Sequence, residues 1–392
     1  MSDQNNSVFE QRVASLRELL DQNDLDALIV SHDDEYLSYE LNEDEERLKY
    51  ITGFSGSAGY AVITSNDLKI NEENIEINQD NTENGIVVDR DCAVFVDGRY
   101  VVQVKEQIDS DIFQDFDLAK VKPAKWISSV MPKNSTVGID INCVSYKEYI
   151  SIKNELGMNN INLVATENNL VDKIWTDKPA SVISEISIFP DEYNGCPSPQ
   201  KRQLIAQTLR DKDLDATVIC DPESICWLLN IRGKDRAYLP VINCKMVAYS
   251  NEALEWYINP NHFKDENLQD QLQEHIGHID IFPEEAFDDV LDRLCSSSCT
   301  VYVDPETTNA HVMTKLYSGG AKVSEGLGLC QMPKACKNHI EVAGEYKAHI
   351  KDGIAMCRFI SWLDNLTALD KPTDSDETFL RRVEGVDEAE LA

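Results

Sequence analysis

The sequence predicts two tandem domains of one α/β architecture, followed by a long helix. Three observations support this: an internal repeat, amphipathic stretches that each lead into an apolar run of strand length, and a sustained helical periodicity near the C-terminal end. A chain of 392 residues is long enough for two to three domains, each with its own core. Its 42% hydrophobic and 27% charged residues are typical of globular proteins.

The repeat carries the domain prediction. Residues 16–30 read LRELLDQNDLDALIV, and residues 205–219, which lie 189 positions later, read IAQTLRDKDLDATVI. Five positions are identical, among them Leu20/Leu209, Asp24/Asp213 and Ala27/Ala216. Apolar residues at steps of three and four, from Phe9 to Leu20, predict an amphipathic helix. A polar turn and a strand over residues 25–30 follow, so each copy opens one α/β domain.

The two copies continue in parallel. An aromatic and apolar segment follows in each, at residues 50–54 and 227–231. A further strand is predicted at residues 61–63 in the first copy and at 246–248 in the second. The first copy also has an insertion rich in Asn and Glu at residues 71–84, which predicts a solvated loop or a marginal hairpin.

A different pattern begins near Asn338. Apolar residues recur every three or four positions, which predicts one helix of about seven turns; they are Ala343, Tyr346, Ile350, Ile354, Cys357, Ile360 and Leu363. A polar linker at 369–376 and the opening of another helix at 386–392 are predicted after it. We place the domains at residues 1–172, 173–330 and 331–392, the last one incomplete. Its apolar stripe must dock on the second domain, bind another chain or belong to a longer parent.

Composition excludes several classes of function. With 36 basic and 70 acidic side chains the net charge is 36 − 70 = −34, so phosphates would be repelled and no nucleic-acid partner is expected. Basic peptides would be attracted, although solubility alone accounts for such acidity. We find no apolar run of about eighteen residues and no leader pattern, so the sequence predicts a soluble, cytoplasmic protein without a membrane partner. Eleven scattered cysteines without a C-x-x-C pair predict reduced, mostly buried thiols.

Two local motifs are better explained by a structural role than by catalysis or ligand binding. Residues 53–59, GFSGSAG, lack the ending of a phosphate-binding loop and the spacing of a hydrolase elbow, which predicts a tight turn between helix and strand. His275 and His278 are three positions apart on a possible helix, but no third ligand is near them in the sequence. His349 on the long helix is interpreted as a solvated or interdomain histidine.

The segment Asp97-Gly98-Arg99-Tyr100 follows a predicted strand at 93–96 and allows two interpretations. An Asp-Gly turn is the structural one. Alternatively, an arginine fixed beside a tyrosine at a strand end binds a carboxylate.

Several segments together resemble one family, Xaa-Pro aminopeptidase (aminopeptidase P) of the long, three-domain type. Their order and spacing are similar to that family over almost the whole chain. The segments are residues 50–59, 97–100, 169–172 with Trp175, 227–233 with Asp235, and 337–338 with Glu341, Gly344 and 348–353.

The resemblance implies an α/β fold with two creatinase-like N-terminal domains, followed by the beginning of a pita-bread (aminopeptidase P/methionine aminopeptidase-like) domain. It also implies removal of an N-terminal residue that precedes proline. Members of the family use two metal ions, usually manganese, held by two Asp, one His and two Glu, and a bridging hydroxide attacks the scissile carbonyl. Two such cations generate a nucleophile at neutral pH and polarise the carbonyl.

The chain departs from the family pattern at the metal ligands. In the family all five ligands follow the long helix, whereas 392 − 353 = 39 residues follow Gly353 here, without a histidine. We therefore expect no metal ligand, no catalytic residue and no cofactor in this chain, with two Mn ions only in the complete enzyme. Leu239, which stands before Pro240 where many relatives have a polar residue, is a smaller departure.

The leading functional hypothesis is the non-catalytic N-terminal part of an Xaa-Pro aminopeptidase, truncated before its metal-binding core and inactive alone. Arg99, Tyr100, Arg232 and Asp235 are the candidate substrate-cleft residues, because their polar tips lie at predicted strand or loop ends. Expected partners of the complete enzyme are short peptides with proline second, and a homodimer partner or a separate catalytic part. The alternative is a stand-alone acidic binding or assembly module with the same fold.

Overall fold

The first domain is built on a six-stranded sheet. The computed structural model describes residues 2–66, 88–264 and 267–369. The strand order is β4-β3-β2-β1-β5-β6, and β2 runs antiparallel to both of its neighbours while the other pairs are parallel. The strands are β1 (Ala27–Ser31), β2 (Gly59–Thr64), β3 (Cys92–Val96), β4 (Phe113–Asp117), β5 (Thr136–Ile139) and β6 (Asn162–Ala165).

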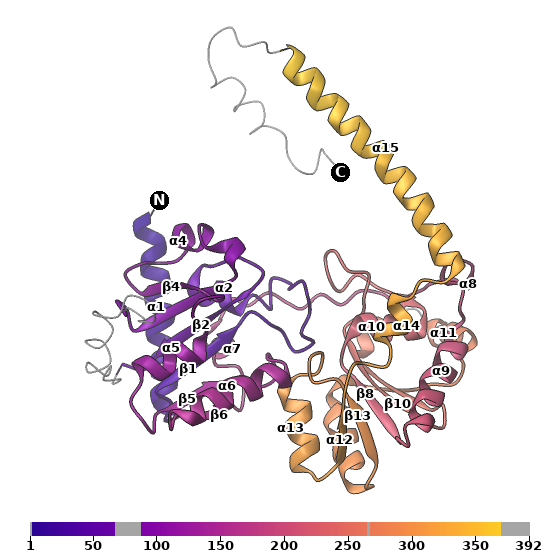
Figure 1. Ribbon diagram of the computed structural model, residues 1–392, viewed down its shortest axis with the longest axis horizontal. Coiled ribbons are helices and arrows are strands. Elements are labelled where there is room, and N and C mark those ends of the chain that lie inside the picture. Colours follow the sequence, from indigo (N-terminus) through magenta and orange to yellow (C-terminus); the bar gives the residue numbers. More distant parts are fainter. Residues whose placement is uncertain (1, 67–87, 265–266, 370–392) are drawn as a thin grey trace. The chain divides into compact units, whose positions relative to one another are not determined.

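The second domain repeats this sheet. Its order is β12-β11-β10-β8-β13-β14, with β10 as the strand that is antiparallel to both neighbours. The predicted strands of both copies are therefore confirmed, and the labelled ribbons of Figure 1 show the two sheets. The strands are β8 (Ala216–Ile219), β10 (Cys244–Tyr249), β11 (Leu254–Ile258), β12 (Asp280–Phe282), β13 (Thr300–Val303) and β14 (Lys322–Glu325).

Helices cover both faces of the first sheet. On one face α1, α2, α4 and α7 pack against the side chains of Leu28, Ala61 and Val94; on the other, α5 and α6 pack against Ile29 and Phe95. Side chains of a strand alternate between the faces, so each strand contributes to two cores. The helices are α1 (Ser2–Gln22), α2 (Arg47–Thr52), α4 (Gln103–Gln107), α5 (Pro123–Val130), α6 (Tyr146–Met158) and α7 (Leu170–Ile174), with a 3₁₀ turn at Gly98–Tyr100.

The second domain has the same three layers. On one face α9, α10 and α11 pack against Met246 and Trp256, and on the other α12 and α13 pack against Val247 and Tyr257. The helices are α9 (Ser198–Asp211), α10 (Pro222–Leu229), α11 (Leu268–Ile276), α12 (Phe287–Ser296), α13 (Ala310–Ser318) and α14 (Gln331–Ala335), with 3₁₀ turns at Pro260–His262 and Glu284–Ala286. A two-stranded sheet of β7 (Ser187–Ile188) and β9 (Ile231–Arg232) adjoins them.

The identical positions of the repeat have matching roles in the two domains. Leu20 and Leu209 are fully buried in equivalent helices, α1 and α9. Asp24 and Asp213 have positive φ values of 53° and 55° in the turn that leads to the strand. Asp and Asn adopt this left-handed conformation more readily than most residues other than glycine. The identical residues of the repeat therefore have structural roles, in the core and in the turn before the strand, in both domains.

The second identical acid, Asp26 in one copy and Asp215 in the other, fixes the parallel neighbour of each central strand. The carboxylate of Asp26 accepts a hydrogen bond from the backbone N–H of Thr136 (2.7 Å), and that of Asp215 accepts one from Thr300 (2.8 Å). The carbonyl oxygens of the same two aspartates accept from Ser65 and Ser250 (2.9 Å each). One short motif thus links three strands in each domain.

The glycine segment is a turn, as predicted. It joins α2, which ends at Thr52, to β2, which begins at Gly59. Gly53 has a φ of 83°, and the carbonyl of Gln107 would lie 2.8 Å from a Cβ placed there. A side chain is therefore excluded at Gly53 by backbone conformation and by space.

A separate unit consists of residues 191–195 and 336–392. It contains α8 (Asp191–Asn194) and the 31-residue helix α15 (His339–Leu369), which confirms the long helix predicted from periodicity. Asn338 caps α15: its side-chain oxygen accepts from the N–H groups of Ile340 (2.9 Å) and Glu341 (3.1 Å). The insertion at 71–84, most of the linker at 369–376 and the helix at 386–392 lie outside the described residues.

Candidate functional site

A polar cavity lies where two loops meet, one from each domain. One loop, residues 32–46, joins β1 to α2 in the first domain, and the other, residues 233–243, joins β9 to β10 in the second. The cavity has a volume of about 290 Å³. Its lining is Glu35, Tyr36, Asn42, Asp44, Glu45, Arg47, Lys178, Ser181, Val182, Ile183, Asp235, Asn243, Lys245, Asn259, His262 and Glu284.

Arg236 joins the two domains beside this cavity. Its guanidinium forms ion pairs with the carboxylates of Asp34 and Glu45, and all three residues are at most 7% exposed. Burial, and then the nearby carboxylate of Asp34, raise the pKa of Glu45 to about 7 against the opposing effect of Arg236. Burial lowers the pKa of Arg236, but the two carboxylates outweigh it and the net pKa is raised. One cation thus faces two acids in a buried contact.

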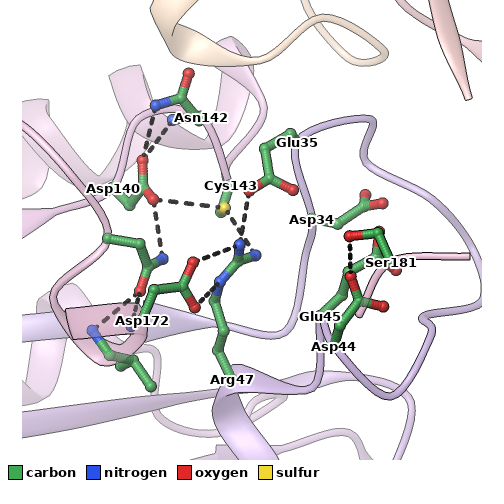
Figure 2. Close-up of polar contacts among 12 residues, drawn as sticks. Asp34, Glu35, Asp44, Glu45, Arg47, Asp140, Asn142, Cys143, Asp172 and Ser181 are labelled. Atoms are coloured by element: carbon green, nitrogen blue, oxygen red, sulfur yellow. Dashed lines mark hydrogen bonds and ion pairs between the residues drawn. The ribbon is translucent and has the colours of Figure 1, made fainter. Parts of the chain in front are cut away.

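A second charged cluster surrounds Arg47 at the start of α2 (Figure 2). Its guanidinium binds Asp172 of α7 through two hydrogen bonds of 2.9 Å and Glu35 through one of 2.7 Å. Lys178 also contacts Asp172 (2.9 Å). Burial raises the pKa of Asp172, but the bonds to Arg47 outweigh it, so the net pKa is lowered. The cluster fixes α7 and the segment after it to α2.

Asp235, one of the four candidate cleft residues, lines the cavity. It is 1% exposed, and its carboxylate accepts hydrogen bonds from the backbone N–H (2.8 Å) and the hydroxyl (2.7 Å) of Ser184 and from the N–H of Asn243 (2.7 Å). His262 lies 3.5 Å away through Nε2. The carbonyl oxygen of Asp235 accepts from the side chain of Asn42 in the first domain (2.8 Å). Asp235 therefore orders its loop at the domain contact.

The other three candidates lie outside the lining of this cavity. Arg99 is bound to Asp97 (2.8 Å) within its own turn, and its side chain is 60% exposed. The hydroxyl of Tyr100 lies 2.6 Å from that of Ser57. Arg232 lies over the ring of Phe189 (4.3 Å to the centroid) and donates to the carbonyl of its neighbour Ile231 (2.7 Å). The structure thus does not bring the four candidates together.

A third polar group in the cavity lining consists of Lys245 and Glu284 of the second domain and Tyr36 of the first. Tyr36 of the first domain donates a hydrogen bond to Glu284, and Lys245 contacts the same carboxylate (3.2 Å). The ammonium of Lys245 also lies over the ring of Tyr36, 5.0 Å from its centroid. The domain contact is therefore rich in paired charges.

The edge of each sheet where α/β folds commonly bind ligands is filled by side chains. Such folds place ligands beyond the carboxyl ends of the strands where the strand order reverses, which here means beyond β1/β5 and β8/β13. The spaces there measure about 10 and 20 Å³, room for a water molecule at most. Arg47 and Asp140 fill the first, and Asp221 and Asp304 fill the second. Neither of these two small spaces has room for a substrate.

The described residues do not fit a metal centre. Within residues 2–66, 88–264 and 267–369 there is no group of three or more His, Cys, Asp and Glu side chains that could hold a metal ion. His275 and His278 do not share a helix, because α11 ends at Ile276; His278 lies near Asp280 (3.4 Å). His349 is 79% exposed beside Glu345, in agreement with the solvated interpretation. In the same part of the chain no helix has the length and apolar character to cross a membrane.

Sequence analysis missed the residues that form the domain contact. Asp34 and Glu45 belong to an acid-rich run between a buried strand and a helix, and Arg236 belongs to a short basic run, RGKDR. Charged runs are usually solvated, and these residues are about 190 to 200 positions apart. The two runs do not occupy equivalent segments of the repeat, because the first precedes α2 and the second follows α10, so the repeat gives no signal that pairs them.

Comparisons with known proteins agree with this architecture. Residues 12–82 and 177–341 match two family models, each described as Creatinase/Prolidase N-terminal domain. The chain is 28% identical over 94% of its length to Xaa-Pro aminopeptidase ApepP of Drosophila melanogaster, and 26% identical over 90% to aminopeptidase P1 of Arabidopsis thaliana. It covers 56% and 54% of those two proteins. The chain thus spans about half the length of the curated relatives it matches.

A solved structure shows the same fold. The X-prolyl aminopeptidase of Caenorhabditis elegans, a cytosolic enzyme with a di-nuclear active site, superposes with a TM-score of 0.78 at 23% identity. The match covers 91% of this chain and 56% of that enzyme. The chain therefore has two tandem creatinase-like N-terminal domains of α/β fold, and its relatives are Xaa-Pro aminopeptidases.

Proposed function

We propose that this chain is the non-catalytic N-terminal part of an Xaa-Pro aminopeptidase. The observation that carries the proposal is the tandem pair of creatinase-like domains within a chain that is similar to such enzymes over more than nine-tenths of its length. The complete enzyme would act in the cytoplasm, removing the N-terminal residue of short peptides with proline second. Residues 1–172 and 173–330 form the two domains of the proposal, and residues 331–392 begin the catalytic one.

In this proposal, the residues that bind the metal ions of the complete enzyme are not among the described residues of this chain. A dinuclear centre, with manganese as the proposed metal, needs several carboxylates and an imidazole that converge on two ions. The described part of the chain has no such group, so we derive no catalytic step from its residues. Its contribution is to form a rigid wall near the substrate entrance and, in a homodimer, to contribute to subunit contacts. Arg99, Tyr100, Arg232 and Asp235 are its proposed cleft residues.

The first test measures what this chain does alone. The purified 392-residue protein is incubated with Mn²⁺ and a tripeptide that has proline at its second position, and metal content and released amino acid are measured. We expect neither stoichiometric metal nor cleavage. Two bound equivalents of manganese together with cleavage would overturn the non-catalytic assignment.

The second test measures the activity of the complete enzyme. The protein is affinity-purified from its source cells and assayed on the same tripeptide with Mn²⁺. We expect Xaa-Pro cleavage, supplied by a longer polypeptide or by a separate catalytic chain that copurifies with it. A preparation without cleavage contradicts the family function, whichever result the first test gives.

The cleft residues are tested in that active preparation. Arg99→Ala and Arg232→Ala are compared with Arg90→Ala, a change of another surface arginine in the first domain. A cleft role predicts a several-fold loss of kcat/KM for the first two variants alone. Unchanged kcat/KM in both removes them from the cleft.

A further inference from the structure

We propose that the contact between the two domains is a proton-dependent latch, in which Glu45 takes up a proton beside Asp34 and Arg236, so that the contact closes more firmly as the pH falls. The proposal concerns the joint between the creatinase-like domains and does not depend on the peptidase activity. It rests on three buried charged side chains and on their surroundings.

The geometry places one cation against two anions. Arg236 comes from the second domain, and Asp34 and Glu45 come from the loop of the first. The guanidinium also donates to the carbonyl of Glu40 (3.4 Å) and to the side-chain oxygen of Asn243 (3.2 Å). With both acids ionised the group has a formal charge of −1 among three residues that are at most 7% exposed. One proton on Glu45 makes it neutral.

Neighbouring groups do not supply the missing positive charge. His32 lies two positions before Asp34. Burial lowers the pKa of His32 in spite of the Asp34 carboxylate, so its imidazole is neutral at pH 7. Asp33 adds another carboxylate close to Asp34; burial, and then Asp34 and Glu148, raise its pKa to about 6. Taking up a proton is therefore the available way to relieve the excess negative charge.

The remaining charged groups around the latch are already engaged. On the first-domain side Asp44 accepts from Ser181 (2.6 Å), and Arg47 binds Glu35 and Asp172. On the second-domain side Lys245 binds Glu284, and Asp235 accepts from Ser184 and Asn243 with His262 beside it. The thiol of Cys143, also near Asp34, is neutral because burial raises its pKa.

The direction of the pH effect follows from the difference in the pKa of Glu45 between the closed and the open form of the contact. The pKa of Glu45 is about 7 in the closed contact and has its ordinary value of 4.5 when the contact opens into water. The closed form therefore binds the proton more tightly, so closure is favoured at low pH and is weakened as the pH rises through 7. Between pH 6 and pH 8 these values give a roughly ten-fold rise in the opening constant.

Amide hydrogen exchange of the two loops tests the latch. Peptides spanning residues 34–46 and 233–243 are followed at pH 6 and pH 8 and corrected for the intrinsic exchange rate. We expect protection to be about ten-fold lower at pH 8 in the wild type. Glu45→Gln, which still offers an oxygen to Arg236 but does not titrate, should reduce that ratio to near one.

The controls separate the latch from general effects. Glu43→Gln removes a carboxylate from an exposed position two residues away and should keep the ten-fold ratio. Because the Asp34 carboxylate is one cause of the raised pKa of Glu45, Asp34→Asn should also reduce the ratio, and this variant serves if Glu45→Gln fails to fold. Equal protection at both pH values in the wild type, or a ratio that survives in both variants, would overturn the proposal.

Discussion

At the scale of single residues, charged side chains are placed where elements join. Asp26, which is half-buried, and Asp215, which is exposed, each connect the strand that follows them to a parallel neighbour, and the buried Arg47 connects α2 to α7. A buried charge such as Arg47 is costly to desolvate, and it persists because it satisfies several hydrogen bonds. Removing one partner of such a pair should therefore lower the free energy of unfolding by more than the intact pair contributes to it.

The two equivalent aspartates should have equal and additive effects. Asp26→Ala and Asp215→Ala each remove a charged acceptor from a strand N–H, so each should lower the free energy of unfolding by about 1 kcal/mol. The double variant should lose about 2 kcal/mol, because the sites lie in different domains. Urea unfolding followed by circular dichroism measures both losses. Asp26→Asn keeps an acceptor oxygen and should lose less; unequal losses at the two sites contradict the equivalence.

Arg47 should be far more important for stability than an exposed arginine. Arg47→Met leaves the carboxylate of Glu35 without its cation and that of Asp172 with Lys178 alone, and we expect a loss of about 3 kcal/mol in the free energy of unfolding. Arg90→Met, at a surface pair of 3.8 Å with Asp111, should change stability by less than about 1 kcal/mol. Denaturant midpoints compare the two variants. Similar midpoints would show that the Arg47 cluster does not stabilise the first domain.

At the scale of elements, α15 has a well-formed start. The side chain of Glu341 accepts from the backbone N–H of Asn338 (2.8 Å), so these two residues form a reciprocal capping box. The amide of Asn338 also donates to the carbonyl of Asn194 in α8 (2.7 Å). Local interactions thus set the first residue of the helix, as the sequence pattern predicted.

The cap should control fraying of the first turn. Asn338→Ala removes two acceptor bonds, which typically costs about 1 kcal/mol, so amide exchange at residues 340–343 should speed up about five-fold. Hydrogen exchange with mass spectrometry measures this. Lys337→Ala changes the exposed neighbour and should leave exchange unaltered. Equal exchange in the two variants would exclude a capping role for Asn338.

At the scale of the whole molecule, the two creatinase-like domains are joined by charge as well as by chain connectivity. Tyr36, Asn42 and Glu45 of one loop contact Glu284, Asp235 and Arg236 of the second domain. Further contacts lie where Asn309 donates to the carbonyl of Glu35 (2.9 Å) and Lys147 pairs with Glu306 (2.5 Å). These contacts couple the unfolding of one domain to that of the other.

Removal of Arg236 should uncouple the domains. Arg236→Met leaves Asp34 and Glu45 buried without a cation, which is strongly unfavourable at pH 8. Calorimetry should show one unfolding transition for the wild type and two for the variant. Arg210→Met, a change at a surface pair of 4.0 Å in the second domain, should keep one transition. A single transition in Arg236→Met contradicts the coupling role.

The extent to which sequence predicted structure differs between elements. The repeat predicted two equivalent domains because Leu20, Asp24 and their counterparts act within about ten residues of chain. Periodicity predicted α15 for the same reason. In contrast, the Arg236 contact joins side chains about 190 to 200 positions apart, and no local pattern encodes which charged residues of a polar run are buried.

Of the candidate cleft residues, Asp235 lies in the interdomain cavity and Arg99 lies on an exposed turn. Both follow strands and have polar tips, so the sequence does not distinguish them. The difference is that the second-domain loop carrying Asp235 reaches the first domain, whereas Asp97 holds Arg99 within its own turn.

The amino-acid sequence by itself determined the duplicated α/β architecture, the long helix and the similarity to Xaa-Pro aminopeptidases, since these depend on short-range periodicity and local motifs. Only the tertiary structure decided that both sheet edges are filled and that the domains meet around a buried arginine and two acids. Burial is a property of the packed chain: the same Asp or Arg is ordinary in water and becomes a strong constraint once a second domain removes the solvent.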